Sequence, residues 1–336
     1  MAKNDNLHQA KKEKNDEFYT QLSDIEKELN NYKDFFNGKV VYCNCDDPRE
    51  SNFFKFFSMN FERLGLKKLI TTGYKKDGHG VAFVYEGDKN GNRKVDETEI
   101  QTTQLEGNGG FETAECIEFL KEADVVVTNP PFSLFRDYVK QLMDYNKKFL
   151  IIGNPNAITY KEIFPYIKEN KLWVGCKSMG SDMLFNVSEE FEKQLVETKK
   201  KGSGYRIVDG KVLGRASAIW FTNINNPKRN RPLDLYRKYN QTDYPKYDNY
   251  DAINVDKVTD IPEDYDGVMG VPISFLDKYC PTQFEIVWQA SGNTKASAPK
   301  EILEKLNYIR HKEDRGGCGV INGKRKYDRL FIRRIS

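Results

Sequence analysis

The sequence predicts an α/β fold built around a buried parallel sheet, and two observations favour this class. Between residues 39 and 152, short apolar segments alternate with segments whose apolar residues recur at helical spacing. The apolar segments are nearly continuous runs of Val, Ile, Leu and Phe, as expected of parallel strands that are buried on both faces. With 336 residues, the chain is long enough for one large domain and a smaller second region.

The predicted elements of the sheet follow one another in a regular order. We expect strands at residues 40–45, 68–72, 124–128 and 148–153, and helices between them at 52–64, 114–122 and 133–145. Residues 81–85 and 97–102 flank the turn 88–92 and are expected to form a hairpin. A helix at 160–170 and strands at 172–175 and 216–222 complete the predicted sheet.

The turn of this hairpin also resembles a calcium-binding loop. Asp88, Asn90, Asn92 and Glu99 stand at plausible ligand positions. However, an EF-hand loop has Gly at its sixth position to allow a sharp bend, and Arg93 occupies that position here. We therefore predict a plain hairpin and no metal site in the chain.

The composition changes near residue 225, where Tyr, Asp, Asn, Lys and Pro become frequent and periodicity fades. Such a change is typical of a domain boundary. Apolar segments at 270–276, 284–288 and 330–335 indicate that the last third also folds, mainly as short strands. We expect a flexible N-terminus at 1–15, a main domain at 16–225 and a smaller region at 226–336.

Composition also limits the location and the partners of the protein. No apolar run approaches the roughly twenty residues needed to cross a bilayer, and the N-terminus lacks the apolar core of a secretory signal. We therefore expect a soluble, cytoplasmic protein with six reduced cysteines and no membrane partner. The net charge of +3 is too small to indicate a nucleic-acid partner, so only local basic clusters can do so. These clusters are Lys199, Lys200 and Lys201; Lys228, Arg229 and Arg231; and Lys324, Arg325 and Lys326.

The tetrapeptide Asn129-Pro130-Pro131-Phe132 carries the clearest functional signal. It follows the predicted strand 124–128 directly, and ligands of open α/β sheets bind at the carboxyl ends of the strands. Two prolines make the backbone rigid and remove two donors, while the amide supplies an acceptor and the aromatic ring a flat surface. This combination suits a planar ring that bears an amino group. Without the preceding strand, a rigid strand exit would be the simpler interpretation.

The chain resembles the EcoRI-type adenine-specific DNA methyltransferases, which are amino-methyltransferases with an Asn-Pro-Pro-Phe motif. The likeness also includes residues 16–21, 41–48, 105–111, 116–120, 219–223 and 271–276. It implies a Rossmann-like, S-adenosylmethionine-dependent methyltransferase domain at 16–225 and a target-recognition and DNA-binding region at 226–336. It further implies transfer of a methyl group to the N6 amino group of a specific adenine in duplex DNA, which protects that DNA against restriction.

The resemblance assigns roles to particular residues. Asn129 and the Pro130 carbonyl would hold the adenine amino group, beside Pro131, while Phe132 stacks on the base. Positioning then carries most of the rate, and no catalytic histidine is needed. The expected cofactor-binding residues are Phe18, Tyr19, Thr20, Cys45, Asp46, Asp47, Pro48, Asn108 and Phe111.

Two features depart from the common pattern of such enzymes. The turn at residues 46–51 contains no glycine, and the second strand runs into Thr71-Thr72-Gly73-Tyr74 without an acidic residue for the ribose hydroxyls. Helix capping explains Asp46 and Asp47 as well as cofactor binding does, because acidic residues suit the start of a helix.

Adenine in a duplex must be rotated out of the base stack, at a cost of about a few kcal/mol. Trp220 and Phe221 are candidates for a second stacking ring, although core packing is the simpler explanation for at least one of them. The basic clusters would contact phosphates of double-stranded DNA, with strongly salt-dependent binding. We expect a monomer. A role in protection against restriction would give the protein a separate cognate restriction endonuclease as its counterpart.

Two other interpretations stay open. Adenine in RNA and the glutamine amide of a protein also offer a planar amino group to such a site. The turn at residues 46–51, which contains no glycine, is also compatible with an inactive DNA-binding relative. The long C-terminal region and the wider likeness favour an enzyme that acts on DNA.

Overall fold

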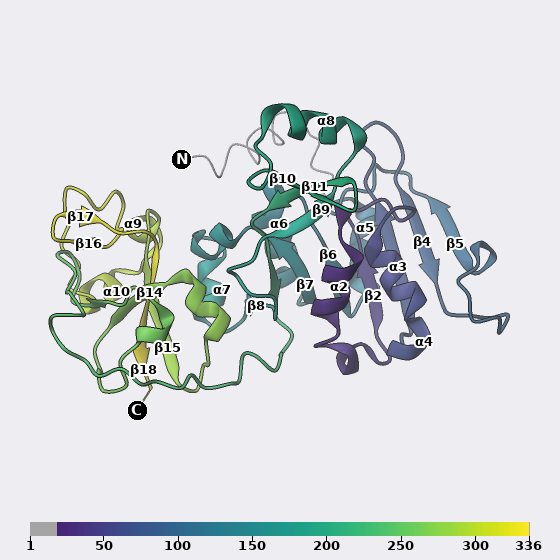
Figure 1. The fold of residues 1–336 in the computed structure, drawn as a ribbon. Coiled ribbons are helices and arrows are strands. Elements are labelled where there is room, and N and C mark those ends of the chain that lie inside the picture. The colour runs from purple at the N-terminus through teal and green to yellow at the C-terminus, as the bar shows by residue number, and fades with distance from the viewer. Residues whose placement is uncertain (1–18, 336) are drawn as a thin grey trace. The chain divides into compact units, whose positions relative to one another are not determined.

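The structure is a computed structural model that describes residues 19–335 (Figure 1). The expected cofactor residue Phe18 and the N-terminal segment 1–15 lie outside the described residues. The chain divides into two compact units. Unit 1 comprises the described residues up to Pro155 together with Gly175–Ile224, and unit 2 comprises Asn156–Val174 and the residues from Asn225 onward. The sequence analysis placed residues 156–174 with the main domain, whereas here they pack within the second unit.

Unit 1 is a mixed α/β structure with a large mixed sheet. Within this unit the strand order is β5-β4-β3-β2-β6-β7-β12. The strands are β2 (Val40–Cys43), β3 (Lys68–Gly73), β4 (Val81–Tyr85), β5 (Ile100–Gln104), β6 (Val125–Thr128), β7 (Lys148–Gly153) and β12 (Ile219–Thr222). The four strands β3, β2, β6 and β7 are parallel to one another, while β4, β5 and β12 run antiparallel to their neighbours.

Alternation along each strand sends side chains to both faces of the sheet, where helices cover them. On one face the core includes α2 (Leu22–Leu29), α3 (Asn52–Met59) and α4 (Phe61–Leu64). On the other face, rings of α5 (Ala114–Glu122) and α6 (Phe135–Asp144) contact Tyr42 and Phe221. The four parallel strands are buried at almost every position, which is why they appear in the sequence as continuous apolar runs.

The predicted helix at 52–64 is interrupted at Asn60, whose side chain donates to the Phe56 carbonyl at 2.7 Å. An asparagine that bonds to its own backbone in this way competes with helix continuation. The helix predicted at 133–145 begins with a 3-10 turn, η3 (Phe132–Leu134), before α6. The helix predicted at 114–122 is confirmed as α5.

Unit 1 also contains a small antiparallel sheet that the sequence analysis did not predict. Its strand order is β1-β9-β11-β10, with β1 (Tyr19–Thr20), β9 (Met183–Asn186), β10 (Tyr205–Val208) and β11 (Lys211–Ala216). Helix α8 (Glu189–Thr198) connects β9 to β10, and Ser188 caps its first turn by accepting from the Phe191 N–H. This sheet brings the start of the described chain beside residues 183–186.

Unit 2 is built on a four-stranded sheet with the order β13-β14-β18-β15. Its strands are β13 (Ile253–Asn254), β14 (Met269–Pro272), β15 (Phe284–Ala290) and β18 (Arg329–Arg334). The remaining elements are α7 (Phe164–Lys168), β8 (Trp173–Val174), η5 (Val258–Asp260), η6 (Ile273–Lys278), α9 (Thr294–Ser297), α10 (Lys300–Lys305), β16 (Val320–Ile321) and β17 (Lys324–Arg325). Its core includes a group of aromatic rings, in which Phe331 contacts Tyr247 and Tyr250. Of the described helices, none is long and apolar enough to cross a membrane.

Candidate active site

The Asn129-Pro130-Pro131-Phe132 motif lies directly after β6, at the carboxyl end of the parallel strands. Asn129 is 9% exposed and Pro130 is buried, whereas Phe132 is half-buried and packs against the main core cluster. The Pro131 carbonyl accepts from the Leu134 N–H at 2.9 Å and so begins the 3-10 turn. The motif is therefore a rigid exit from a central strand, with its amide in a mostly buried position.

The motif is tied to the neighbouring strand through Asn44, the residue that follows β2. The Thr128 hydroxyl donates to the Asn44 carbonyl, and the Tyr138 hydroxyl of α6 donates to Asn44 Oδ1 at 2.5 Å. All three side chains are buried. The sequence analysis did not identify Asn44 or Tyr138; a polar residue within the apolar run 40–45 was the available signal.

Cys45 adopts a left-handed backbone conformation, with φ at +78°. Glycine adopts this conformation at little cost, while other residues are rarely found in it. The chain therefore makes the sharp turn after β2 without the glycine whose absence the sequence analysis noted. Burial raises the pKa of the Cys45 thiol well above its ordinary value, and the charge of Asp46 acts in the same direction. The thiol is accordingly neutral.

The turn after Cys45 contains both expected acidic residues. Ser51 caps α3 by accepting from the Phe53 and Phe54 N–H groups, and its hydroxyl donates to Asp46 Oδ2 at 3.3 Å. Asp47 accepts from the Arg49 N–H at 2.9 Å. The helix cap is therefore Ser51, and neither acidic side chain accepts from an N–H group of the first turn of α3 in the interactions seen here.

The segment with Asn108 packs against the same edge of the sheet. The Asn108 carbonyl accepts from the Lys75 N–H at 2.9 Å. Gly109 has φ at +76°, and a Cβ added to it would collide with the Gly73 carbonyl oxygen. A Cβ added to Gly73 would in turn lie 2.7 Å from Pro48 Cδ. Close backbone approach thus brings two expected cofactor segments, those with Pro48 and Asn108, together around the end of β3.

Two further contacts involve expected cofactor residues, one between Phe111 and α6 and one between Thr20 of β1 and the start of α3. The Phe111 ring meets Tyr138 edge-on at a centroid distance of 4.9 Å. The Thr20 carbonyl accepts from Asn52 Nδ2 at 2.7 Å, which places β1 at the start of α3. Thr20 Oγ1 is buried and has no hydrogen-bond partner among the described residues. Tyr19 lies beside it in β1.

The proposal that Trp220 or Phe221 stacks on a base is wrong for this structure. Both side chains are completely buried in β12. The Trp220 ring contacts Phe53 of α3 on one face of the sheet, and the Phe221 ring contacts Phe135 of α6 on the other. Both rings are core residues, because adjacent positions in a strand covered on both faces are both buried.

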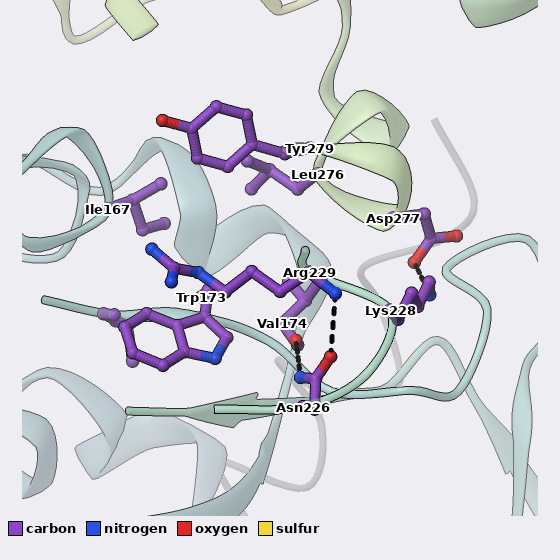
Figure 2. Close-up of a pocket in the computed structure, with 10 residues that line it drawn as sticks. Ile167, Trp173, Val174, Asn226, Lys228, Arg229, Leu276, Asp277 and Tyr279 are labelled. Carbon is purple, nitrogen blue, oxygen red and sulfur yellow. Dashed lines mark hydrogen bonds and ion pairs between the residues drawn. The ribbon is translucent and has the colours of Figure 1, made fainter. Parts of the chain in front are cut away.

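The three basic clusters differ in their surroundings. Lys200, Lys201, Arg231, Lys324 and Arg325 are exposed, and Lys199 and Lys326 are half-buried. In unit 2, Lys228 pairs with Asp277 at 2.9 Å, and the Arg229 guanidinium lies 3.8 Å from the Trp173 ring centroid (Figure 2). Arg229 also donates to Asn170 Oδ1, and burial lowers its pKa. These two side chains are thus engaged within unit 2, whereas the other clusters face solvent to a greater extent.

A mixed α/β sheet with an Asn-Pro-Pro-Phe motif at a central strand end, beside a tight acidic turn, defines an amino-group methyltransferase. Comparison with known proteins specifies the family. The family model described as "Adenine-specific methyltransferase EcoRI" matches residues 6–335. The chain belongs to this family and is an adenine-specific DNA methyltransferase of the restriction-modification kind.

Curated relatives resemble the chain over most of its length. It is 50% identical to Type II methyltransferase M.EcoRI of Escherichia coli, over 85% of this chain and 89% of the relative. It is 39% identical to M.MgeORF184P of Mycoplasma genitalium, over 98% of both chains, and 39% identical to M.MpnI of Mycoplasma pneumoniae, over 97% of both. No solved structure matches the chain.

Proposed function

We propose that the protein methylates the N6 amino group of a specific adenine that has been rotated out of duplex DNA, with S-adenosylmethionine as the methyl donor. One observation carries this proposal. The motif and the expected cofactor segments meet at adjoining strand ends, because the Thr128 hydroxyl binds the Asn44 carbonyl between β6 and β2. A site for the amino group therefore adjoins a site for the donor, and a direct transfer needs both.

The roles of the motif residues follow from the chemistry of an amino group on an aromatic ring. Its lone pair is delocalised, so the nitrogen is a weak nucleophile. We assign Asn129 Oδ1 and the Pro130 carbonyl as acceptors for the two N–H groups, which would direct the lone pair out of the ring plane. Phe132 would stack on the base, and Pro131 would keep the backbone rigid. Orientation of this kind can supply several kcal/mol of the barrier reduction.

The residues around the end of β2 fit S-adenosylmethionine. When bound, this cofactor supplies a methyl group on a positively charged sulfur. Asp46 and Asp47 provide carboxylates for the cationic methionine portion, and the buried Thr20 Oγ1, which lacks a partner among the described residues, can donate or accept. The close backbone packing of Gly73 and Gly109 leaves the Asn108 segment beside Pro48. Tyr19, Cys45 and Phe111 complete the proposed pocket in what would be a Rossmann-like domain.

We further propose that unit 2 is the target-recognition region. The recognition region would then comprise residues 156–174 in addition to the region 226–336 expected from the sequence, because both pack in unit 2. The preferred phosphate contacts are the exposed residues of the basic clusters, because phosphate binding requires accessible charge; they are Lys200, Lys201, Arg231, Lys324 and Arg325. A monomer that acts in the cytoplasm and protects DNA from a separate cognate endonuclease would account for the family membership.

The decisive experiment is adenine methylation in the DNA of cells that express the intact protein or Asn129→Ala, read at single-base resolution. The intact protein should modify one defined motif. We expect Asn129→Ala to lower methylation at least about 100-fold, because the amino group loses one of its two acceptors. Asn129→Asp should keep measurable activity, since a carboxylate retains the acceptor oxygen.

Asn31→Ala is a matched control, because Asn31 is exposed and bonds only to carbonyl groups of its own helix in the interactions seen here. Its methylation should equal that of the intact protein. Thermal unfolding and calorimetric titration with S-adenosylmethionine should show that Asn129→Ala is folded and still binds the cofactor. Labelled methyl groups that appear only in RNA or in protein would contradict the proposal.

A further inference from the structure

The loop between β4 and β5 contains a feature that the methyltransferase reaction does not use. Over residues 88–99, oxygen-bearing side chains occur at the first, third, fifth, ninth and twelfth positions, as Asp88, Asn90, Asn92, Asp96 and Glu99. These are ligand positions of an EF-hand calcium loop, whose twelfth position is a bidentate Glu. The sequence analysis rejected this likeness because Arg93 occupies the sixth position.

The structure removes that objection. Arg93 has φ at +61°, in the left-handed region for which EF-hand loops use glycine. The backbone bend is thus formed without glycine at this position. Its N–H donates to Asp88 Oδ2 at 2.6 Å, so the bend turns the chain back toward the first residue of the loop.

The backbone of the loop coils around its own side-chain oxygen atoms. The other Asp88 oxygen accepts from the Gly91 N–H at 2.7 Å. Asn90 Oδ1 accepts from the Asn92 N–H at 3.0 Å, and Asn92 Oδ1 from the Lys94 N–H at 2.8 Å. The side-chain oxygens of the first, third and fifth positions thus each accept from a backbone N–H group within the loop.

Glu99 supplies the independent observation that points to a ligand. Its side chain is 9% exposed, and Oε1 accepts from the Lys89 and Asn90 N–H groups at 2.7 and 3.1 Å. The carboxylate therefore points into the loop. Its second oxygen, Oε2, is buried and has no hydrogen-bond partner among the described residues. A buried anionic oxygen without a partner is costly, and a cation would compensate for it.

Asp96 completes the ring of oxygen ligands. Its carboxylate accepts from Asn90 Nδ2 at 2.8 Å and from Asn92 Nδ2 at 2.5 Å. The Asp96 carboxylate is thus held against the side chains of the third and fifth positions of the loop.

We propose that residues 88–99 bind a calcium ion through Asp88, Asn90, Asn92, Asp96 and both carboxylate oxygens of Glu99. No three acidic, Cys or His side chains in the described part of the chain already surround one centre. The Nδ2 groups of Asn90 and Asn92 now donate to Asp96, so binding requires both side chains to turn their amide oxygens toward the ion. Calcium is favoured over magnesium, because it accepts six to eight oxygen ligands in flexible geometry, while magnesium demands a near-ideal octahedron.

Calcium bound here would stabilise unit 1 instead of taking part in methyl transfer. Val95 and Ile100, at the eighth position and just after the twelfth, pack against the main core cluster. The Asp88 N–H donates to Glu62 of α4 at 3.1 Å. An ion that binds only the folded loop would raise the stability of the unit to which the loop is anchored.

The test is calorimetric titration of the purified, chelator-treated full chain with calcium chloride, and in parallel with magnesium chloride. We expect one calcium per chain, with a Kd between about 10⁻⁶ and 10⁻³ M, and at least about tenfold weaker magnesium binding. Glu99→Gln should weaken calcium binding at least about tenfold. Glu97→Gln, an exposed change at a position of the loop that supplies no ligand, should leave it unaltered.

A second variant keeps the test decisive if Glu99→Gln fails to fold. Asp96→Asn removes the negative charge of a proposed ligand whose carboxylate accepts from the side-chain amides of Asn90 and Asn92, so folding should survive. It should also weaken calcium binding at least about tenfold and reduce the calcium-induced rise in melting temperature. Absence of calcium binding at millimolar concentration, equal binding by Asp96→Asn and the intact chain, or stronger binding of magnesium would each overturn the proposal.

Discussion

Units 1 and 2 place their polar side chains by different means. In unit 1, Asn44 and Thr128 become neighbours because two buried parallel strands, β2 and β6, end at the same edge. In unit 2, side chains join distant segments: Asn249 donates to the Cys318 carbonyl at 2.9 Å and accepts from the Val320 N–H at 2.9 Å. The comparison teaches that in unit 1 the paired strands set the site and buried side chains fasten their ends, whereas in unit 2 buried polar side chains join segments that no strand pairing connects.

The largest expected loss of stability follows from a change in the core that packs against the large sheet of unit 1. Trp220→Ala removes a completely buried ring that contacts Phe53 behind the sheet. We expect a loss of about 3–5 kcal/mol in the free energy of unfolding, measured in urea. Once correctly folded protein is selected, DNA affinity per molecule should be unchanged, because the ring does not reach a substrate. If Trp220→Ala lost DNA affinity without losing stability, the result would support a role for Trp220 in stacking on a base.

A side-chain anchor in unit 2 should give an intermediate effect that depends on pH. Burial alone would raise the pKa of Asp314, but hydrogen bonds from the Tyr308 hydroxyl and from the His311 and Gly316 N–H groups lower it below its ordinary value. A lowered pKa in the folded state stabilises the protein above about pH 3.9, and this contribution is lost as the pH falls through the folded pKa.

We therefore expect Asp314→Asn to cost about 2 kcal/mol at pH 7 and progressively less below pH 4. The measurement is the urea midpoint of the intact chain and of the variant from pH 7 to pH 3. Glu313→Gln, an exposed neighbour, serves as the control. A difference that grows with acidity would show that the carboxylate does not stabilise unit 2 in this way.

The smallest expected change in stability should have a functional consequence. Tyr138→Phe deletes the hydroxyl that binds Asn44 between β2 and β6 and should cost about 1 kcal/mol of stability. Because Asn44 connects the motif with the proposed cofactor turn, kcat should fall several-fold while the KM for DNA changes little. Single-turnover methylation at saturating DNA would measure this. An unchanged kcat would show that the strand pairing alone positions the motif.

Local sequence signals predicted the regular parts of unit 1. Strands β4 and β7 match the predicted ranges in full, because alternation or a continuous apolar run marks them. The interruption at Asn60 depends on one side-chain hydrogen bond that periodicity does not reveal. In the small sheet around β9, Tyr19 pairs with Asn186 over a sequence distance that local patterns do not reveal. Strands β10 and β11 of the same sheet form a local hairpin around Asp209-Gly210, a turn signal that the sequence analysis overlooked.

The candidate site was only partly predictable for a related reason. A motif that follows an apolar strand is visible in the sequence, and so Asn129 was identified. Contacts between distant residues are not visible, so Asn44 and Tyr138 were missed and Trp220 was placed incorrectly. The left-handed conformations of Cys45 and Arg93 were also unexpected, because their residue types disfavour them.

Because unit 2 consists of two chain segments, the order in which the two units can fold during synthesis is constrained. The first segment carries Phe164, whose ring packs on Trp288, and Thr159, whose carbonyl accepts from Asn293. These partners are synthesised more than one hundred residues later. Residues 156–174 therefore cannot complete their core until the second segment of unit 2 has been synthesised. A truncation near residue 225 would leave the same segment permanently without its core, so unit 1 cannot be isolated by simply shortening the gene.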